Sequence, residues 1–145
     1  MRNRVVTLLA ASALLAGGSV TLGASNAAAA TWTFEKSSVA SDGSFTITAY
    51  NSGTNAGTME WNGDPVGSQP GDAFRVTDRL ADGRGMEASM ISPVNDRVAT
   101  TRGYASPYTS PWNTGDLTED TTVFIQLCAV AGLNESCSAA YSGHA

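Results

Sequence analysis

The 145-residue chain has few of the residues on which catalysis and nucleic-acid binding depend. It contains one histidine, two cysteines and eight Lys or Arg residues against thirteen Asp or Glu residues, with a formal net charge of −5. A serine or cysteine nucleophile needs a base within reach, and the single histidine, His144, lies beside the last residue, where mobility is common. No basic cluster is present to neutralise a phosphate backbone. We therefore expect no enzymatic activity and no nucleic-acid partner.

The chain also lacks an apolar run long enough to cross a membrane. The longest run, from Val5 to Ala16, is shorter than the roughly 20 residues that a spanning helix needs. Two arginines precede it and small residues ending at Ala30 follow it, which is the pattern of a secretory signal peptide. We predict a signal peptide over residues 1–30 with cleavage after Ala30, and one secreted extracellular domain over residues 31–145, with no membrane association after cleavage.

Removal of the leader increases the acidic excess of the remaining domain. Two of the eight cationic residues and none of the acidic ones lie within it. A negative net charge favours solubility and opposes self-association. The composition therefore predicts a soluble monomer of single-domain size.

No segment keeps a helical period for three turns, and the commonest pattern is alternation of apolar and polar residues. This alternation is typical of strands with one buried face. About seven to eight such strands, separated by turns rich in Gly, Asn and Asp, predict an all-β antiparallel sandwich. The clearest alternating runs are Trp32–Phe34, Phe45–Tyr50, Met59–Trp61, Phe74–Thr77, Met86–Met90 and Val123–Cys128.

Two turns suggest specific strand pairings. Asp82-Gly83 lies between two alternating runs and predicts a hairpin from Ala73 to Ile91. A second hairpin would turn at Gly132 to Glu135 and place Cys128 opposite Cys137. In an oxidising compartment these cysteines should form one structural disulfide, which stabilises the fold by about 2 to 3 kcal/mol in the chain-entropy model.

Two stretches of the chain carry a resemblance to a known group of proteins. They are the segment RVTDRLADGR at residues 75–84 and the segment VFIQLC at residues 123–128 with Cys137 beyond it. Together with the Ala-rich leader, they resemble small secreted β-sandwich proteins of actinobacteria. The resemblance implies secretion and an immunoglobulin-like sandwich, and it carries over no catalytic residues. Cys128 and Cys137 are too close in sequence to bridge two sheets as in a true immunoglobulin domain.

Paired carboxylates could support hydrolysis of a glycoside, and Asp116, Glu119 and Asp120 lie close together in the sequence. They precede a predicted strand, in a loop where acidic residues are usually solvated. A catalytic acid also needs a buried carboxyl in a cleft. We interpret the three as surface residues and keep a small hydrolase as the least favoured function.

Metal binding finds little support in the sequence. Asp78, Asp82 and Gly83 suggest part of a calcium loop, but Leu80 stands where an EF-hand would place its next ligand. Two cysteines and His144 are too few for a structural zinc site. We therefore predict no metal and no cofactor.

One segment stands out, because residues 104–113 hold three aromatic and two proline residues. Exposed Tyr104, Tyr108 and Trp112 could stack on sugar rings or anchor a protein partner. The same rings could instead fold over the end of the sandwich and cap its core. The leading hypothesis is binding of a cell-wall or environmental polysaccharide through this segment, with Trp61 as a further candidate. The alternative is a protein-binding module or inhibitor that uses the same segment or the cysteine hairpin.

Overall fold

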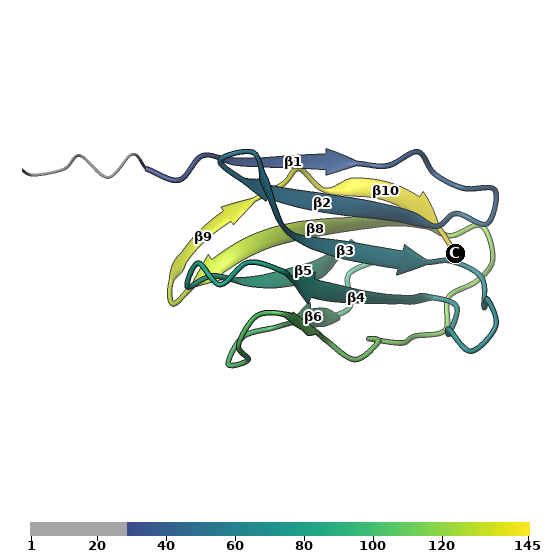
Figure 1. Ribbon diagram of the computed structural model, residues 1–145. Coiled ribbons are helices and arrows are strands. Elements are labelled where there is room, and N and C mark those ends of the chain that lie inside the picture. The colour runs from purple at the N-terminus through teal and green to yellow at the C-terminus, as the bar shows by residue number, and fades with distance from the viewer. Residues whose placement is uncertain (1–28) are drawn as a thin grey trace, which may run out of the picture.

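Two antiparallel β-sheets packed face to face form the fold in the computed structural model, which describes residues 29–145 (Figure 1). The predicted signal peptide lies outside the described residues except for its last two alanines. The first sheet has the strand order β1-β2-β3-β4-β7, and the second has the order β10-β8-β5-β6, with β9 paired to β8 as well. The strands of the first sheet are β1 (Trp32–Lys36), β2 (Phe45–Asn51), β3 (Thr54–Asn62), β4 (Ala73–Asp78) and β7 (Tyr108–Thr109). Those of the second are β5 (Gly85–Ser92), β6 (Val98–Thr100), β8 (Thr122–Ala131), β9 (Asn134–Cys137) and β10 (Tyr141–His144).

The predicted all-β antiparallel sandwich is confirmed, but the number of strands was underestimated. The described residues form ten strands, and those absent from the alternating runs are the short strands β6, β7, β9 and β10. Strands of two to four residues are too short to display an alternating pattern. No helix in this part of the chain is long and apolar enough to span a membrane.

The core lies between the sheets and is built from alternate residues of the longer strands. In β2, for example, Phe45, Ile47 and Ala49 are buried while the residues between them are partly exposed. The register Ile47↔Met59↔Val76 places equivalent inward-facing residues of β2, β3 and β4 side by side. The second sheet contributes inward-facing residues from β5 and β8, namely Met86, Ala88, Met90, Val123, Ile125, Leu127 and Ala129.

The predicted hairpin from Ala73 to Ile91 is wrong, because its two strands belong to different sheets. β4 pairs with β3 and β7, whereas β5 pairs with β8 and β6. The connection through Asp82-Gly83 instead crosses from one sheet to the other, with Leu80 partly buried against the core. Alternation and a turn signal showed where each strand ends, but they do not determine whether two successive strands pair.

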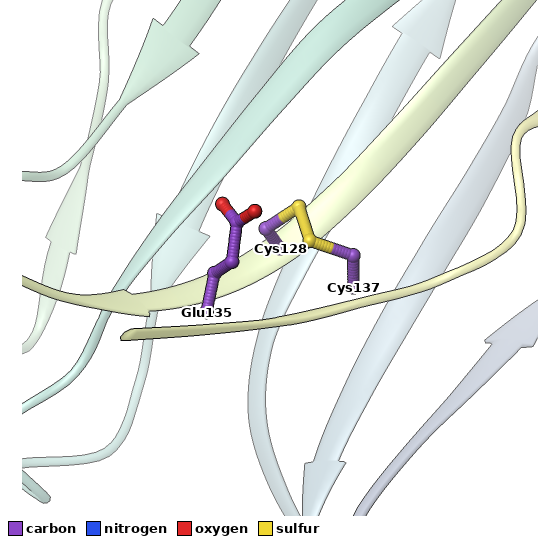
Figure 2. Close-up of side chains that lie close together, drawn as sticks. All are labelled: Cys128, Glu135 and Cys137. Atoms are coloured by element: carbon purple, nitrogen blue, oxygen red, sulfur yellow. A yellow bond between two sulfur atoms is a disulfide. The ribbon is translucent and has the colours of Figure 1, made fainter. Parts of the chain in front are cut away.

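The second predicted hairpin and its disulfide are confirmed. β8 and β9 pair in the register Cys128↔Cys137, and the turn between them contains Gly132 at a φ of 58°. A disulfide joins the two cysteines, whose Cα atoms lie 4.0 Å apart (Figure 2). This bond holds two adjacent strands of one sheet together.

The two ends of the sandwich differ. We call the end formed by residues 79–84, 101–107 and 131–133 the open end. We call the end formed by residues 37–44, 63–72 and 114–121, together with Ala145, the closed end.

Hydrogen bonds tie the closed end together around Trp61. The Trp61 indole Nε1 donates to the His144 carbonyl oxygen at 3.0 Å, and Ala145 is buried. His144 belongs to β10 and pairs with Thr122 of β8, so it lies in a strand and not in a loose terminal segment. At Gly63, an added Cβ would collide with the Asp42 carbonyl oxygen, which shows how closely the backbones approach here.

Candidate functional site

A depression of about 490 Å³ occupies the open end of the sandwich. Its walls come from the β4–β5 connection, the segment between β6 and β7, and the β8–β9 turn. The first two of these segments cross from one sheet to the other. Volumes of roughly 300 to 1,000 Å³ are usual for sites that bind small molecules.

The wall of the depression carries an exposed aromatic ring, Tyr104, which is 59% exposed. The Tyr104 ring stacks on the ring of Tyr108, with centroids 4.0 Å apart and planes 3° apart. Tyr108 does not line the depression. Its ring lies against the face of Tyr104 that is turned away from a ligand. Desolvation, and then the neighbouring Tyr104 hydroxyl, raise the pKa of Tyr108. The stack fixes one face of Tyr104 and leaves the other for contact with a ligand.

A buried carboxyl, that of Asp78, also lines the depression, although the residue is only 3% exposed. The Leu80 N–H donates to its Oδ1 atom at 3.1 Å, and among the described residues no other well-formed hydrogen bond reaches this carboxyl. Burial raises the pKa of Asp78, and the nearby Asp82 adds to this effect. The Leu80 hydrogen bond and the Ser106 hydroxyl oppose it.

The Ser106 hydroxyl lies beside this carboxyl and lines the same depression. Its oxygen is buried and lies close enough to the carboxyl to lower the pKa of Asp78, but it completes no hydrogen bond of good geometry among the described residues. Buried polar groups are normally paired, because an unpaired one costs about 1 to 3 kcal/mol. Asp78 and Ser106 therefore leave hydrogen-bonding capacity in the wall of the depression.

Two arginines complete the polar lining. Arg84 donates from Nη1 to the Ala129 carbonyl oxygen at 3.1 Å, and its guanidinium lies 5.5 Å from the centre of the Trp32 ring. Arg102 forms an ion pair with Glu87 at 2.7 Å and also donates to the Gly132 carbonyl oxygen at 3.0 Å. The hydrogen bond from Arg102 lowers the pKa of Glu87. These contacts hold both guanidinium groups at the depression with further N–H groups available.

The three predicted binding residues do not form one surface. Tyr104 and Tyr108 lie together at the open end, but Trp112 lies elsewhere, with its ring 4.4 Å from the Arg75 guanidinium on the first sheet. Trp61, considered as a helper, is 2% exposed in the core and cannot contact a ligand. The aromatic segment therefore has two parts. Tyr104 and Tyr108 lie at the depression, and Trp112 packs on the first sheet.

The acidic residues considered for hydrolysis lie apart from the depression. Asp116, Glu119 and Asp120 are all exposed in the loop that precedes β8, at the closed end. His144 lies at the same end and lines a second, shallower depression of about 510 Å³ together with Asp120, Thr122 and Ser142. None of the hydrogen bonds among the described residues involves the His144 ring. Its imidazole therefore has no aligned partner that would activate a nucleophile.

The residues of the suggested calcium loop have other partners. Asp82 accepts a hydrogen bond from Asn51 Nδ2 at 2.7 Å and another from the Arg84 N–H at 3.0 Å. These donors occupy both carboxyl oxygens, which a cation would otherwise need. The two aspartates consequently play separate roles, Asp82 in the turn and Asp78 in the depression.

Glu135 lies beside the disulfide on the β8–β9 hairpin (Figure 2). Its carboxyl and the two sulfur atoms fall within 4.8 Å of one another, a spacing compatible with metal ligation. The sulfur atoms are bonded to each other, however, and metal binding by cysteine requires thiolates. The disulfide form thus offers one carboxylate and no thiolate ligand.

Sequence reasoning did not place Asp78, Ser106 and Arg84 in one site, and it considered Asp78 only as part of a calcium loop. One signal was available for Asp78, because it continues the inward-facing series of Phe74 and Val76 along β4. A carboxyl at a core-facing position is expensive to bury and so points to a special role. Ser106 and Arg84 gave no signal, since only the tertiary structure brings their loops together.

Comparison of the chain with protein-family models, with curated proteins and with solved structures gave no match.

Proposed function

We propose that this protein is a secreted, non-catalytic module that binds carbohydrate in the depression at the open end. The observation that carries the proposal is the exposed Tyr104 ring beside the buried Asp78 carboxyl in one depression. The Ala-rich leader pattern supports secretion. Among the described residues that line this depression, Asp78 is the single carboxyl, whereas glycoside hydrolysis ordinarily uses two, and this favours binding over catalysis.

Sugars suit this arrangement because they present two kinds of surface. The C–H face of a sugar ring packs on an aromatic ring, and the hydroxyl groups at its edge form hydrogen bonds. Tyr104 offers the flat apolar face. The Asp78 carboxyl, which accepts one hydrogen bond from Leu80, and the Ser106 hydroxyl offer further acceptor and donor capacity.

The test measures binding of the purified protein to chitin, cellulose, bacterial cell wall and soluble oligosaccharides. Tyr104→Ala should lower the affinity for the bound glycan by about tenfold or more, which corresponds to about 1.4 kcal/mol. Trp112→Ala is the matched control, because Trp112 comes from the same segment and packs on Arg75 away from the depression. That variant should bind within about twofold of the original protein.

Circular dichroism would establish that both variants remain folded. An equal loss of binding in the two variants would count against the depression as the site. Failure of the unmodified protein to bind any of the glycans would refute the carbohydrate proposal itself.

We also propose that the sandwich is immunoglobulin-like. Such domains place strands A, B, E and D in one sheet and C, F and G in the other. The strand sets β3-β4-β7 and β10-β8-β5-β6 support a correspondence to A-B-E and to G-F-C with one added edge strand. The crossing from β4 to β5 would then match the B–C connection, with β1 and β2 as an N-terminal addition to the first sheet.

A second candidate function is binding of a protein partner by the β8–β9 hairpin. Leu133 at its tip is fully exposed, and the disulfide stiffens the strands on either side. A rigid loop with an apolar tip is typical of inhibitors and docking modules. Leu133→Asp would abolish capture of a secreted protein partner while leaving glycan binding unchanged, whereas the carbohydrate proposal predicts that Tyr104→Ala has the larger effect on function.

A further inference from the structure

The depression offers one sugar-binding surface, and this limits the kind of carbohydrate that it fits. Among the described residues, the exposed large hydrophobic side chains include two aromatic residues, Tyr104 and Phe124. Phe124 lies on β8 opposite Ser142 of β10, away from the open end. A long polysaccharide chain or a crystalline surface would need several rings in a row, each stacking on one sugar unit.

The other aromatic side chains near the site cannot extend the surface. One face of Tyr104 is covered by Tyr108, and the Trp32 ring is approached by the Arg84 guanidinium. Trp112 packs on Arg75 in the same way. The depression therefore offers a bound glycan one aromatic ring for stacking, and the remaining contacts would be with polar groups of the lining.

The polar groups next to that position suit a sugar with many free hydroxyls. An internal unit of a chain has two glycosidic linkages, whereas a terminal unit has one and keeps an additional hydroxyl. Internal units also keep free hydroxyls, so the hydroxyl that distinguishes a chain end is the one that a linkage would otherwise occupy. The Asp78 carboxyl is buried in the lining beside the Ser106 hydroxyl, and a linkage oxygen, which has no proton, could not donate to this carboxyl. A donor hydroxyl on the bound sugar would satisfy the carboxyl.

We propose that the depression recognises the terminal sugar unit of a glycan chain, stacked on Tyr104 with a free hydroxyl donating to Asp78. This inference rests on the proposed carbohydrate-binding function and narrows it from polysaccharide surfaces to chain ends. The volume of about 490 Å³ accommodates a ligand of this size.

The test titrates the purified protein calorimetrically with soluble oligomers of glucose, N-acetylglucosamine, mannose and galactose, from two to six units long. Each chain presents the same terminal unit, so the affinity per mole of chain should stay constant with length. Partial hydrolysis of the parent polymer should raise its binding capacity per gram by the same factor as the number of chain ends. Asp78→Asn should lower the affinity by about tenfold, because the hydrogen bond to a charged acceptor is lost.

The outcomes separate this inference from the function on which it rests. An affinity that climbs with each added unit, or a capacity that follows polymer mass, would overturn chain-end recognition and still support carbohydrate binding. Binding to insoluble polymer alone would have the same meaning if Tyr104→Ala abolished it. No binding to any oligomer or polymer would overturn both.

Discussion

Both ends of the sandwich are built from loops that connect strands, but they differ in how fully their buried polar groups are hydrogen-bonded. At the closed end the Trp61 indole is satisfied by a carbonyl oxygen, and the Asp72 carboxyl accepts from the Leu117 N–H at 2.8 Å. Arg97 there donates to Asp72 and Asn113 carbonyl oxygens, although its Nη1 atom is buried without a partner. At the open end a buried carboxyl and hydroxyl face a depression.

This difference is one of the observations on which we base the proposal that the open end binds a ligand. Folding stability favours pairing every buried polar group within the protein, as most of the closed end does. Leaving Asp78 and Ser106 incompletely paired costs stability, and a ligand can recover that cost. We therefore expect substitutions at the closed end to affect mainly stability, and substitutions at the open end to affect mainly binding.

The largest expected effect is that of Trp61→Ala at the closed end. The change removes a large buried side chain and its hydrogen bond to His144, and should lower the free energy of unfolding by about 3 to 5 kcal/mol. Urea denaturation would measure this loss. Tyr104→Ala at the open end is the comparison, and a loss of similar size there would contradict the division of roles between the ends.

The second-largest effect is expected from removal of the Cys128–Cys137 disulfide, which lies on the hairpin next to the open end. Replacing Cys128 and Cys137 together by serine should lower the free energy of unfolding by about 2 to 3 kcal/mol, because the unfolded chain regains the freedom of a short loop. The β8–β9 turn contributes to the depression, so glycan affinity should fall as well. Unchanged stability in urea would mean that strand pairing alone holds the hairpin.

Two glycines allow the cost of steric crowding to be compared with the cost of an unfavourable backbone conformation. Gly63→Ala would force a Cβ against the Asp42 carbonyl oxygen and should cost about 1 to 3 kcal/mol. Gly103 has open space around it but a φ of 84°, so Gly103→Ala should cost roughly 1 kcal/mol through the left-handed conformation.

Asparagine provides the control, since it tolerates positive φ better than alanine but is larger. At position 103 asparagine should cost less than alanine, and at position 63 it should cost more. The reverse order at either position in thermal unfolding would contradict the contrast between a crowded end and an open one.

The smallest effect is the pH dependence contributed by Asp78. Because burial raises the pKa of this carboxyl in the folded state, the folded protein holds the proton more tightly than the unfolded chain. The contribution is fully present below about pH 4, the usual value for an aspartate, and is lost as the pH rises through the raised pKa. Asp78→Asn keeps an acceptor for the Leu80 N–H. Because asparagine does not ionise, the variant does not lose stability at this position as the pH rises.

The measurement compares urea unfolding of the two proteins from pH 4 to pH 7. Relative to the original protein, the Asp78→Asn variant should gain stability as the pH rises. Taking the difference removes the contribution of Glu87, which has the opposite sign because Arg102 lowers its pKa. A difference that stays flat would show that Asp78 ionises as freely in the fold as in the unfolded chain.

The sequence predicted the strands well because each long strand has one face in the core. The alternation at Phe45–Asn51 and Thr122–Ala131 follows directly from burial of every second side chain. The disulfide was also predictable, since two nearby cysteines flank a turn signal. These features depend on residues that are close in the sequence.

Features that depend on distant residues were not predictable in the same way. The wrong pairing across Asp82-Gly83 arose because a local turn signal contains no information about which sheet receives the next strand. The separation of Trp112 from Tyr104 depends on Arg75, a residue of another strand. The site itself combines loops that meet only after both sheets have formed.

The crossing loops that form the depression also make heat a means of identifying its ligand. Two of the three loops connect one sheet to the other, so the depression cannot persist when either sheet unfolds. A compound that binds only the folded state stabilises it by about 2.7 kcal/mol when its concentration is one hundred times the dissociation constant. The melting temperature of the protein can therefore rank a library of sugars directly, with no enzymatic assay and no immobilised polymer.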